Sequence, residues 1–141
     1  MTRIGLFGGS FNPVHLGHLL VAQAAREECQ LQRLVFIPAA QSPFKPDLAL
    51  APAQERLRLL RLALCGLSHF EVDDLEIVRG GISYTIDTVR EYAQRHPLTL
   101  FFYLVGADHV AQLAKWREAR ELAQRLEFLV IPRPGDALTP L

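Results

Sequence analysis

The sequence predicts an α/β fold in which a doubly wound, five-stranded parallel sheet carries helices on both faces. Short apolar runs alternate with longer segments of helical periodicity, and strands that alternate with helices build parallel sheets through right-handed crossovers. The apolar runs are continuous, which is typical of strands that are buried on both faces. The expected strands are residues 3–7, 34–37, 70–72, 99–105 and 128–131.

The segments between these strands predict the helices. Residues 52–65 carry a stripe of leucines among arginines, with proline at the first position and Gly66 as a natural stop. We expect residues 75–78 to form a further short extended piece that leads into the turn at Gly80 and Gly81. The other helices are expected at 16–30, at 85–95 and, in two pieces, over 108–126.

Length and composition fit one domain, which we expect to span residues 1–141. Half of the residues are hydrophobic, 21% are charged and the formal net charge is zero, so nothing in the composition indicates a nucleic-acid polymer or a membrane as a partner. No apolar stretch approaches the roughly 18 residues of a membrane span. The two cysteines lack metal-site spacing, and reduced thiols predict a cytoplasmic protein. The oligomeric state stays open, a homo-oligomer included.

The most informative segment lies directly behind the first expected strand. Residues 8–18 read Gly-Gly-Ser-Phe-Asn-Pro-Val-His-Leu-Gly-His. A strand, a glycine turn and a helix in this order form a place where α/β proteins hold phosphates. His15 and His18 are three residues apart, so they share one helix face and can donate hydrogen bonds to phosphate oxygens. The alternatives are two packed or surface histidines, and a metal site for which no third ligand can be placed.

Further polar residues follow other expected strands. Ligands of doubly wound sheets bind at the carboxyl ends of the strands, where residues 8–18, 38–45, 106–108 and 132–135 would meet. Lys45 is one of two lysines in the chain and lies in a proline-rich loop over residues 38–51. It either offers a positive charge to a phosphate or is a solvated loop lysine.

Four motifs together resemble those of a known enzyme family. Residues 8–18 are similar to the signature of the HxGH nucleotidylyltransferase superfamily. Residues 82–88 resemble the SYT-x-DT block of the bacterial nicotinate-nucleotide adenylyltransferases, Gly106-Ala107-Asp108 with Trp116 resembles their GAD…W block, and residues 131–135 resemble their RPG block. The resemblance covers the chain almost end to end and implies a Rossmann-like sheet of the nucleotidylyltransferase type.

The resemblance implies a reaction and a set of site residues. AMP would pass from ATP to nicotinate mononucleotide, giving nicotinate adenine dinucleotide and pyrophosphate on the route to NAD. Mg²⁺ would accompany ATP and be held mainly by the nucleotide, without protein metal ligands. The implied catalytic residues are His15, His18 and Lys45. The implied ATP-binding residues are Gly8, Gly9, Ser10, Phe11 and Gly17. The implied nicotinate mononucleotide-binding residues are Thr85, Asp108, Trp116 and Arg133.

Several of these residues have a second, structural interpretation. Thr85 either holds a carboxylate through its hydroxyl and the first-turn amides or is a plain N-cap. Trp116 either stacks on the pyridine ring or anchors a helix to the core. Asp108 either accepts from a ribose hydroxyl or caps the following helix, and Arg133 is an exposed arginine that could meet a carboxylate or phosphate.

The resemblance also has a gap at the end of the chain. Family members carry a C-terminal Ile-Ser-x-Thr-x-x-Arg-like motif that holds the triphosphate, and nothing similar follows the RPG block here, so we expect a domain truncated at its C-terminus. Two alternatives to the adenylylation of nicotinate mononucleotide therefore stay open. One is a catalytically weak or inactive mononucleotide-binding remnant. The other is a related HxGH transferase acting on nicotinamide mononucleotide or pantetheine phosphate.

Overall fold

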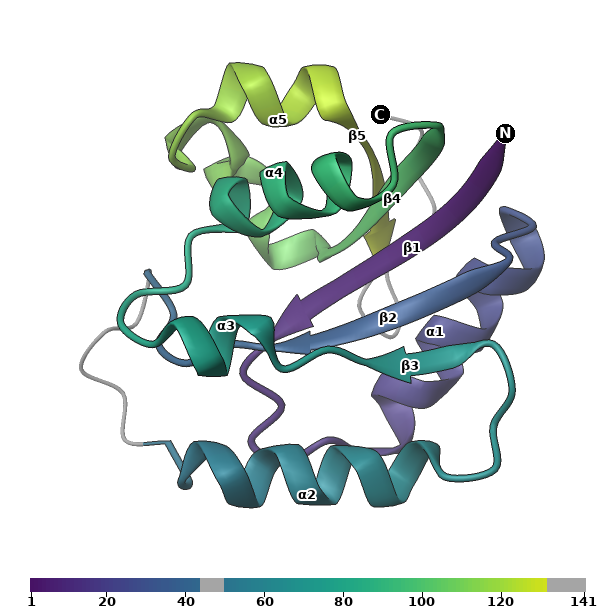
Figure 1. The fold of residues 1–141 in the computed structure, drawn as a ribbon, viewed down its shortest axis with the longest axis vertical. Helices are drawn as coiled ribbons and strands as arrows, with labels where there is room; N and C mark the ends of the chain where they lie inside the picture. The colour runs from purple at the N-terminus through teal and green to yellow at the C-terminus, as the bar shows by residue number, and fades with distance from the viewer. Residues whose placement is uncertain (44–49, 132–141) are drawn as a thin grey trace.

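The computed structural model describes residues 1–43 and 50–131, and it contains the predicted five-stranded sheet (Figure 1). The strands lie in the order β3-β2-β1-β4-β5, and every neighbouring pair is parallel. This confirms the doubly wound fold class. The strands are β1 (Thr2–Gly9), β2 (Arg33–Pro38), β3 (Phe70–Val72), β4 (Thr99–Gly106) and β5 (Leu126–Ile131).

The helices cover both faces of the sheet. Figure 1 shows α4 and α5 on one side of the strands and α1 and α2 on the other. No helix in the described part of the chain is long and apolar enough to span a membrane. The helices are α1 (Leu16–Glu28), α2 (Ala53–Leu64), α3 (Leu75–Arg79), α4 (Thr85–Arg95), the 3₁₀ helix η1 (Ala107–Lys115) and α5 (Ala119–Arg125).

One predicted element is wrong, because the segment after β3 forms the short helix α3 instead of an extended piece. The Asp73 carboxylate accepts a hydrogen bond from the backbone N–H of Leu75 at 3.0 Å, which starts the turn. Leu75 and Glu76 are buried, whereas Val78 is exposed. A short apolar run does not distinguish a helix from a strand, and here local capping and burial against the sheet decided.

Successive side chains of the central strand point into two separate cores. Ile4 and Leu6 of β1 pack with buried residues of α4 and α5, while Phe7 packs with buried residues of α1 and α2. This alternation is the normal pleat of a strand that is covered on both sides. The crossover after β1 runs over one face and the crossover after β4 over the other, so the carboxyl ends of β1 and β4 form the switch point at which such sheets bind ligands.

Candidate functional site

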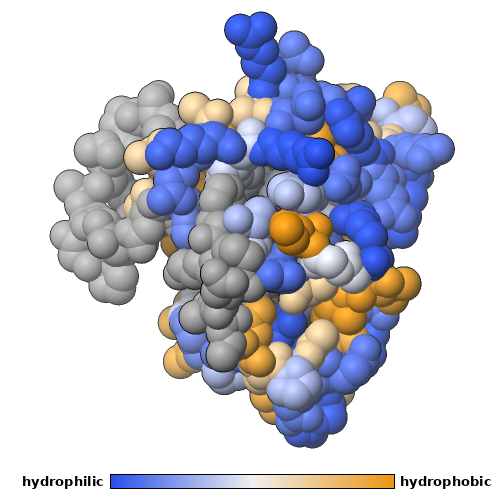
Figure 2. Space-filling view, turned by 90° about the vertical axis from the view of Figure 1, so that its left-hand side faces the viewer, coloured by the Kyte–Doolittle hydropathy of each residue, from blue (hydrophilic) through white to orange (hydrophobic). Residues whose placement is uncertain are grey.

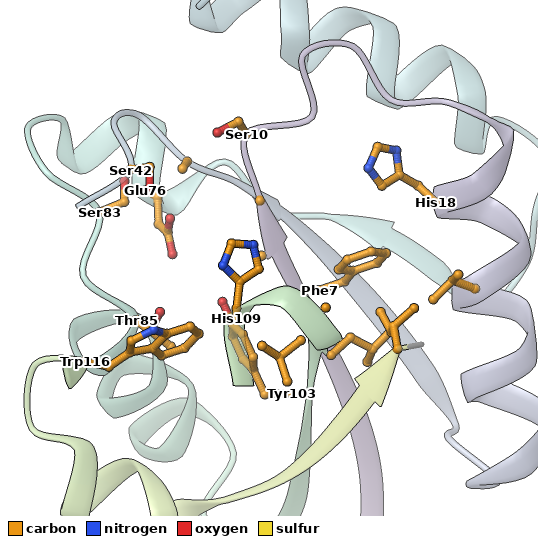
Figure 3. Close-up of a pocket in the computed structure, with 18 of the residues that line it drawn as sticks. Phe7, Ser10, His18, Ser42, Glu76, Ser83, Thr85, Tyr103, His109 and Trp116 are labelled. Carbon is orange, nitrogen blue, oxygen red and sulfur yellow. The ribbon is translucent and has the colours of Figure 1, made fainter. Parts of the chain in front are cut away.

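A cavity of about 890 Å³ lies at this switch point (Figure 3). Its volume is near the upper end of the roughly 300–1,000 Å³ that is usual for ligand pockets. Figure 2 shows the same end of the molecule, with hydrophilic side chains over the upper part and hydrophobic patches lower down. The polar side chains that line the cavity belong to Ser10, His15, His18, Ser42, Glu76, Ser83, Thr85, Tyr103, His109 and Trp116.

The two predicted histidines stack on each other at one end of the cavity. His15 lies directly before α1 and His18 in its first turn, and their ring centroids are 3.8 Å apart. The backbone N–H of His15 donates to Nδ1 of His18 at 3.0 Å, so neutral His18 carries its proton on Nε2. Burial, together with the neighbouring His15, lowers the pKa of His18. The site therefore holds a neutral imidazole whose Nε2–H is a hydrogen-bond donor.

Two phenylalanines hold the His18 ring in place. The ring centroids of Phe7 and Phe11 lie 5.9 and 5.0 Å from that of His18, in edge-on geometry. Phe11 is only 4% exposed and is absent from the residues that line the cavity. Its φ of 45° is in the left-handed region, which turns the chain sharply after β1. The Phe11 ring thus packs against His18 from within the core, and Phe11 does not line the cavity.

The glycines of the segment make room for protein side chains. A Cβ on Gly17 would come within 2.9 Å of the His15 ring, so glycine there leaves room for the stacked pair. A Cβ on Gly8 would overlap the hydroxyl of Tyr103. The space beside the Cα of Gly8 is therefore filled by the Tyr103 side chain. At Gly9 a Cβ would make only ordinary contacts, at 3.5 Å from the Phe11 ring.

Thr85 and Trp116 line the other end of the cavity (Figure 3). Thr85 is the first residue of α4, and Tyr84 rather than Thr85 occupies the N-cap position, without a side-chain capping bond. Trp116 follows η1 and packs edge-on against Tyr103 and Phe128, with ring centroids 6.0 and 6.4 Å away. Trp116 therefore anchors η1 to the core and also presents its ring to the cavity.

A buried carboxyl group lies between Thr85 and the loop after β2. Glu76 is only 6% exposed and accepts a hydrogen bond from the Thr88 hydroxyl at 2.6 Å. Burial raises the pKa of Glu76 to about 7, although the Thr88 hydrogen bond and the charge of Arg79 act in the opposite direction. Burial likewise raises the pKa of Tyr103, so its hydroxyl stays protonated at neutral pH.

Sequence reasoning missed Glu76 and Tyr103. Glu76 lay in a segment that was expected to be extended, and Tyr103 lay inside the most apolar run of the chain. The available signal was a tyrosine hydroxyl in a strand that otherwise carries no polar side chain beyond its first residue, because a buried hydroxyl needs a partner.

Arg56 is a third residue that the sequence did not single out. Arg56 lies in the leucine-rich segment of α2 and is only 2% exposed. Its guanidinium donates to the backbone carbonyls of Ser10 at 2.7 Å, Ala39 at 2.8 Å and Ala51 at 3.0 Å. Burial lowers the pKa of Arg56. The side chain ties the segments after β1 and β2 to the start of α2, and so shapes the histidine end of the cavity.

Three predicted site residues are described only in part or not at all. Lys45 and Arg133 lie outside the described residues, and so does the Asp108 side chain. Asp108 is the second residue of η1, and Gly106 occupies the N-cap position. The alternative interpretation of Asp108 as the N-cap of the following helix is therefore wrong.

Comparison with known proteins identifies the family. Residues 6–140 match the model of the cytidylyltransferase-like family. A probable nicotinate-nucleotide adenylyltransferase of Opitutus terrae is 44% identical over 133 residues, which are 94% of this chain and 68% of the relative. The corresponding protein of Shouchella clausii is 45% identical over 135 residues, which are 96% of this chain and 70% of the relative. The chain belongs to the nicotinate-nucleotide adenylyltransferases.

Solved structures share the fold of this nucleotidyltransferase. Nicotinic acid mononucleotide adenylyltransferase of Plasmodium falciparum, in complex with NaAD, superposes with a TM-score of 0.76 at 16% identity, over 97% of this chain and 78% of that one. A Vibrio parahaemolyticus protein assigned to the nicotinate-nucleotide adenylyltransferases gives a TM-score of 0.77 at 22% identity, over 94% of this chain and 74% of that one. At these identities the likeness concerns the fold alone.

Proposed function

We propose that this chain transfers AMP from ATP to nicotinate mononucleotide, releasing pyrophosphate and nicotinate adenine dinucleotide. The observation that carries the proposal is one cavity with two chemically different ends. One end offers the stacked imidazoles of His15 and His18, which suit phosphates. The other offers the Trp116 ring and the start of α4, which suit an aromatic carboxylate.

At the histidine end the chain holds the triphosphate of ATP. Nε2–H of His18 donates to an oxygen of the reacting phosphate, and His15 supports the same group from the stacked position. Donors that are fixed before the reaction stabilise the charge that develops in the transition state, because they need not reorganise. The backbone of Gly8, Gly9 and Ser10 lines the same side of the cavity.

The chemical step needs no nucleophile from the protein. A phosphate oxygen of the mononucleotide bonds to the α-phosphorus of ATP, the bond from that phosphorus to the bridging oxygen of the β-phosphate breaks, and pyrophosphate leaves with the electron pair. The attacking oxygen is already anionic at neutral pH, so catalysis consists of positioning and charge stabilisation. Thus the protein has to place two phosphates in line.

Magnesium fits this site as a companion of ATP. Within residues 1–43 and 50–131, no group of three or more histidine, cysteine, aspartate or glutamate side chains is arranged to hold a metal ion. The histidine end offers nitrogen ligands, whereas Mg²⁺ prefers oxygen, so phosphate oxygens of the nucleotide would hold it. When bound, Mg²⁺ would neutralise charge on the phosphates and on the leaving pyrophosphate.

At the other end the chain binds the pyridine nucleotide. Trp116 stacks on the pyridine ring, and the free amides in the first turn of α4, with the Thr85 hydroxyl, bind its carboxylate. Asp108 accepts a hydrogen bond from a ribose hydroxyl. The resemblance adds Lys45 and Arg133 as partners of phosphate or carboxylate groups.

The test is pyrophosphate release by the 141-residue chain with ATP, Mg²⁺ and one of three acceptors. Nicotinate mononucleotide should support turnover, while nicotinamide mononucleotide and pantetheine phosphate should not, because a site built for a carboxylate leaves its donors unpaired against other groups. Turnover with another acceptor would reassign the substrate. If the folded chain binds nicotinate mononucleotide but releases no pyrophosphate, the transferase activity is refuted in favour of a binding remnant.

A further inference from the structure

A third histidine lies in the cavity, apart from the stacked pair. His109 is the third residue of η1, directly behind β4, and its side chain is exposed. In Figure 3 its imidazole stands between the group formed by Thr85 and Trp116 and the group formed by Phe7 and His18. The ring thus lies at the middle of the cavity, where its two ends meet.

The histidines are the basic side chains among the described residues that line the cavity. Among its described lining residues there is no lysine and no arginine, and Glu76 is the carboxyl group among them. The imidazoles of His15, His18 and His109 are therefore the basic side chains that these described residues bring to the cavity. His15 and His18 are stacked on each other at one end, which leaves His109 as the ring placed to serve the middle.

The order of the chemical groups in the mononucleotide determines which of them lies beside the His109 imidazole. The pyridine, the ribose and the phosphate follow one another, so a pyridine at Trp116 with its phosphate directed toward His18 places the ribose phosphate in the middle of the cavity. An imidazole N–H that donates to an anionic oxygen forms a charge-assisted hydrogen bond, which is stronger than a neutral one.

We propose that His109 donates a hydrogen bond to the phosphate of the mononucleotide substrate and so orients the group that attacks ATP. The proposal rests on the proposed function, because it assumes nicotinate mononucleotide as the ligand. It assigns to His109 a role in binding the nucleophile, separate from the role of His15 and His18 toward the triphosphate.

The test compares two ligands that differ in one phosphate. Binding of nicotinate mononucleotide and of nicotinate riboside is measured by calorimetry on the 141-residue wild type, His109→Ala and His109→Asn. His109→Ala should weaken the mononucleotide by about 10- to 100-fold, the size of one hydrogen bond to a charged group, and change the riboside less than about 2-fold. His109→Asn keeps a donor and should recover part of the loss.

Gln112→Ala is the matched control, because Gln112 is an exposed residue of the same helix that does not line the cavity. It should change neither affinity. Equal weakening of both ligands by His109→Ala would overturn the proposal, since the ring would then serve the pyridine, the ribose or the fold. Unchanged mononucleotide binding would also overturn it. If wild type binds the riboside as tightly as the mononucleotide, the contact with the phosphate is refuted and the proposed function is not. If wild type binds neither ligand, the proposed function is refuted.

Discussion

The two ends of the cavity are built in opposite ways. The histidine end comes from one continuous segment, residues 8–18, which runs from the last residues of β1 into the first turn of α1. The other end is assembled from α3, α4, β4 and η1, whose side chains lie up to forty positions apart along the chain, from Glu76 to Trp116. The first end thus takes its two histidines from one local turn, which Arg56 ties to α2, whereas only the sheet brings the residues of the second end together.

A contact between β1 and β4 joins the two ends. Leu6 of β1 pairs with Tyr103 of β4 in the sheet, and the Tyr103 hydroxyl fills the space beside Gly8 two residues further on. A substitution at this contact should alter the binding of both substrates, whereas a substitution at His18 or Trp116 should alter the binding of one substrate only. The comparison therefore predicts how mutations divide between the two ligands.

The largest expected effect is the loss of turnover in His18→Ala. Removing a preorganised donor to the reacting phosphate should lower kcat by about 100-fold or more, while the affinity for nicotinate mononucleotide changes less than about 3-fold. Steady-state kinetics and calorimetry with the mononucleotide measure the two quantities. His69→Ala, an exposed histidine outside this cavity, is the control and should resemble wild type. Equal losses in turnover and mononucleotide affinity would show that His18 supports the whole fold rather than one end.

The second effect concerns the pH dependence of stability. The pKa of Glu76 is about 7 in the folded protein, above its ordinary value of 4.5, so the folded state binds this proton more tightly than the unfolded state. The resulting stabilisation is fully present below about pH 4.5 and is lost as the pH rises through about 7, by about 3 kcal/mol at most. Glu76→Gln cannot titrate, so wild type should lose stability relative to this variant between pH 5 and pH 8.

Urea unfolding at both pH values measures this difference. Glu28→Gln, which changes an exposed carboxylate, serves as the matched control and should follow the wild-type curve. Parallel curves for wild type and Glu76→Gln would contradict the burial of an ionisable carboxyl group at this end.

The third effect tests the contact between the two ends. Gly8→Ala places a methyl group against the Tyr103 hydroxyl and should cost about 1–3 kcal/mol of unfolding free energy, as overpacking of a core does. Tyr103→Phe removes the hydroxyl and should recover most of this loss in the double variant. A double-mutant cycle by thermal or urea unfolding measures the coupling. Additive effects of the two substitutions would mean that Gly8 is required for another reason.

The smallest effect is spectroscopic. Trp116 is the one tryptophan of the chain, so its fluorescence reports on the pyridine end without labelling. Nicotinate mononucleotide should change the emission, whereas ATP alone should leave it nearly unchanged. Trp116→Phe retains an aromatic ring and should weaken mononucleotide binding by only a few-fold, which is less than the roughly 1–3 kcal/mol that a complete loss of stacking costs. A response to ATP alone would show that the two ends are not separate.

The sequence by itself determined the order of strands and helices and the histidine end of the cavity. Continuous apolar runs alternating with helical patterns suffice for a parallel sheet, and the Gly8–His18 segment contains both stacked histidines and the turn that leads into α1. The prediction failed at residues 75–78, because the five-residue helix α3 is too short to show helical periodicity and a hydrogen bond from the Leu75 N–H to the Asp73 carboxylate favours the helical turn.

Only the tertiary structure decided the rest of the site. Arg56 is buried because the carbonyls of Ser10 and Ala39, from the segments after β1 and β2, meet that of Ala51 around its guanidinium, and no pattern within α2 contains that information. Glu76, Tyr103 and His109 enter the cavity because the sheet register and the crossovers place their elements at one edge. Burial and long-range hydrogen bonding are properties of the folded chain. The roles of residues that depend on them could therefore not be predicted from the sequence.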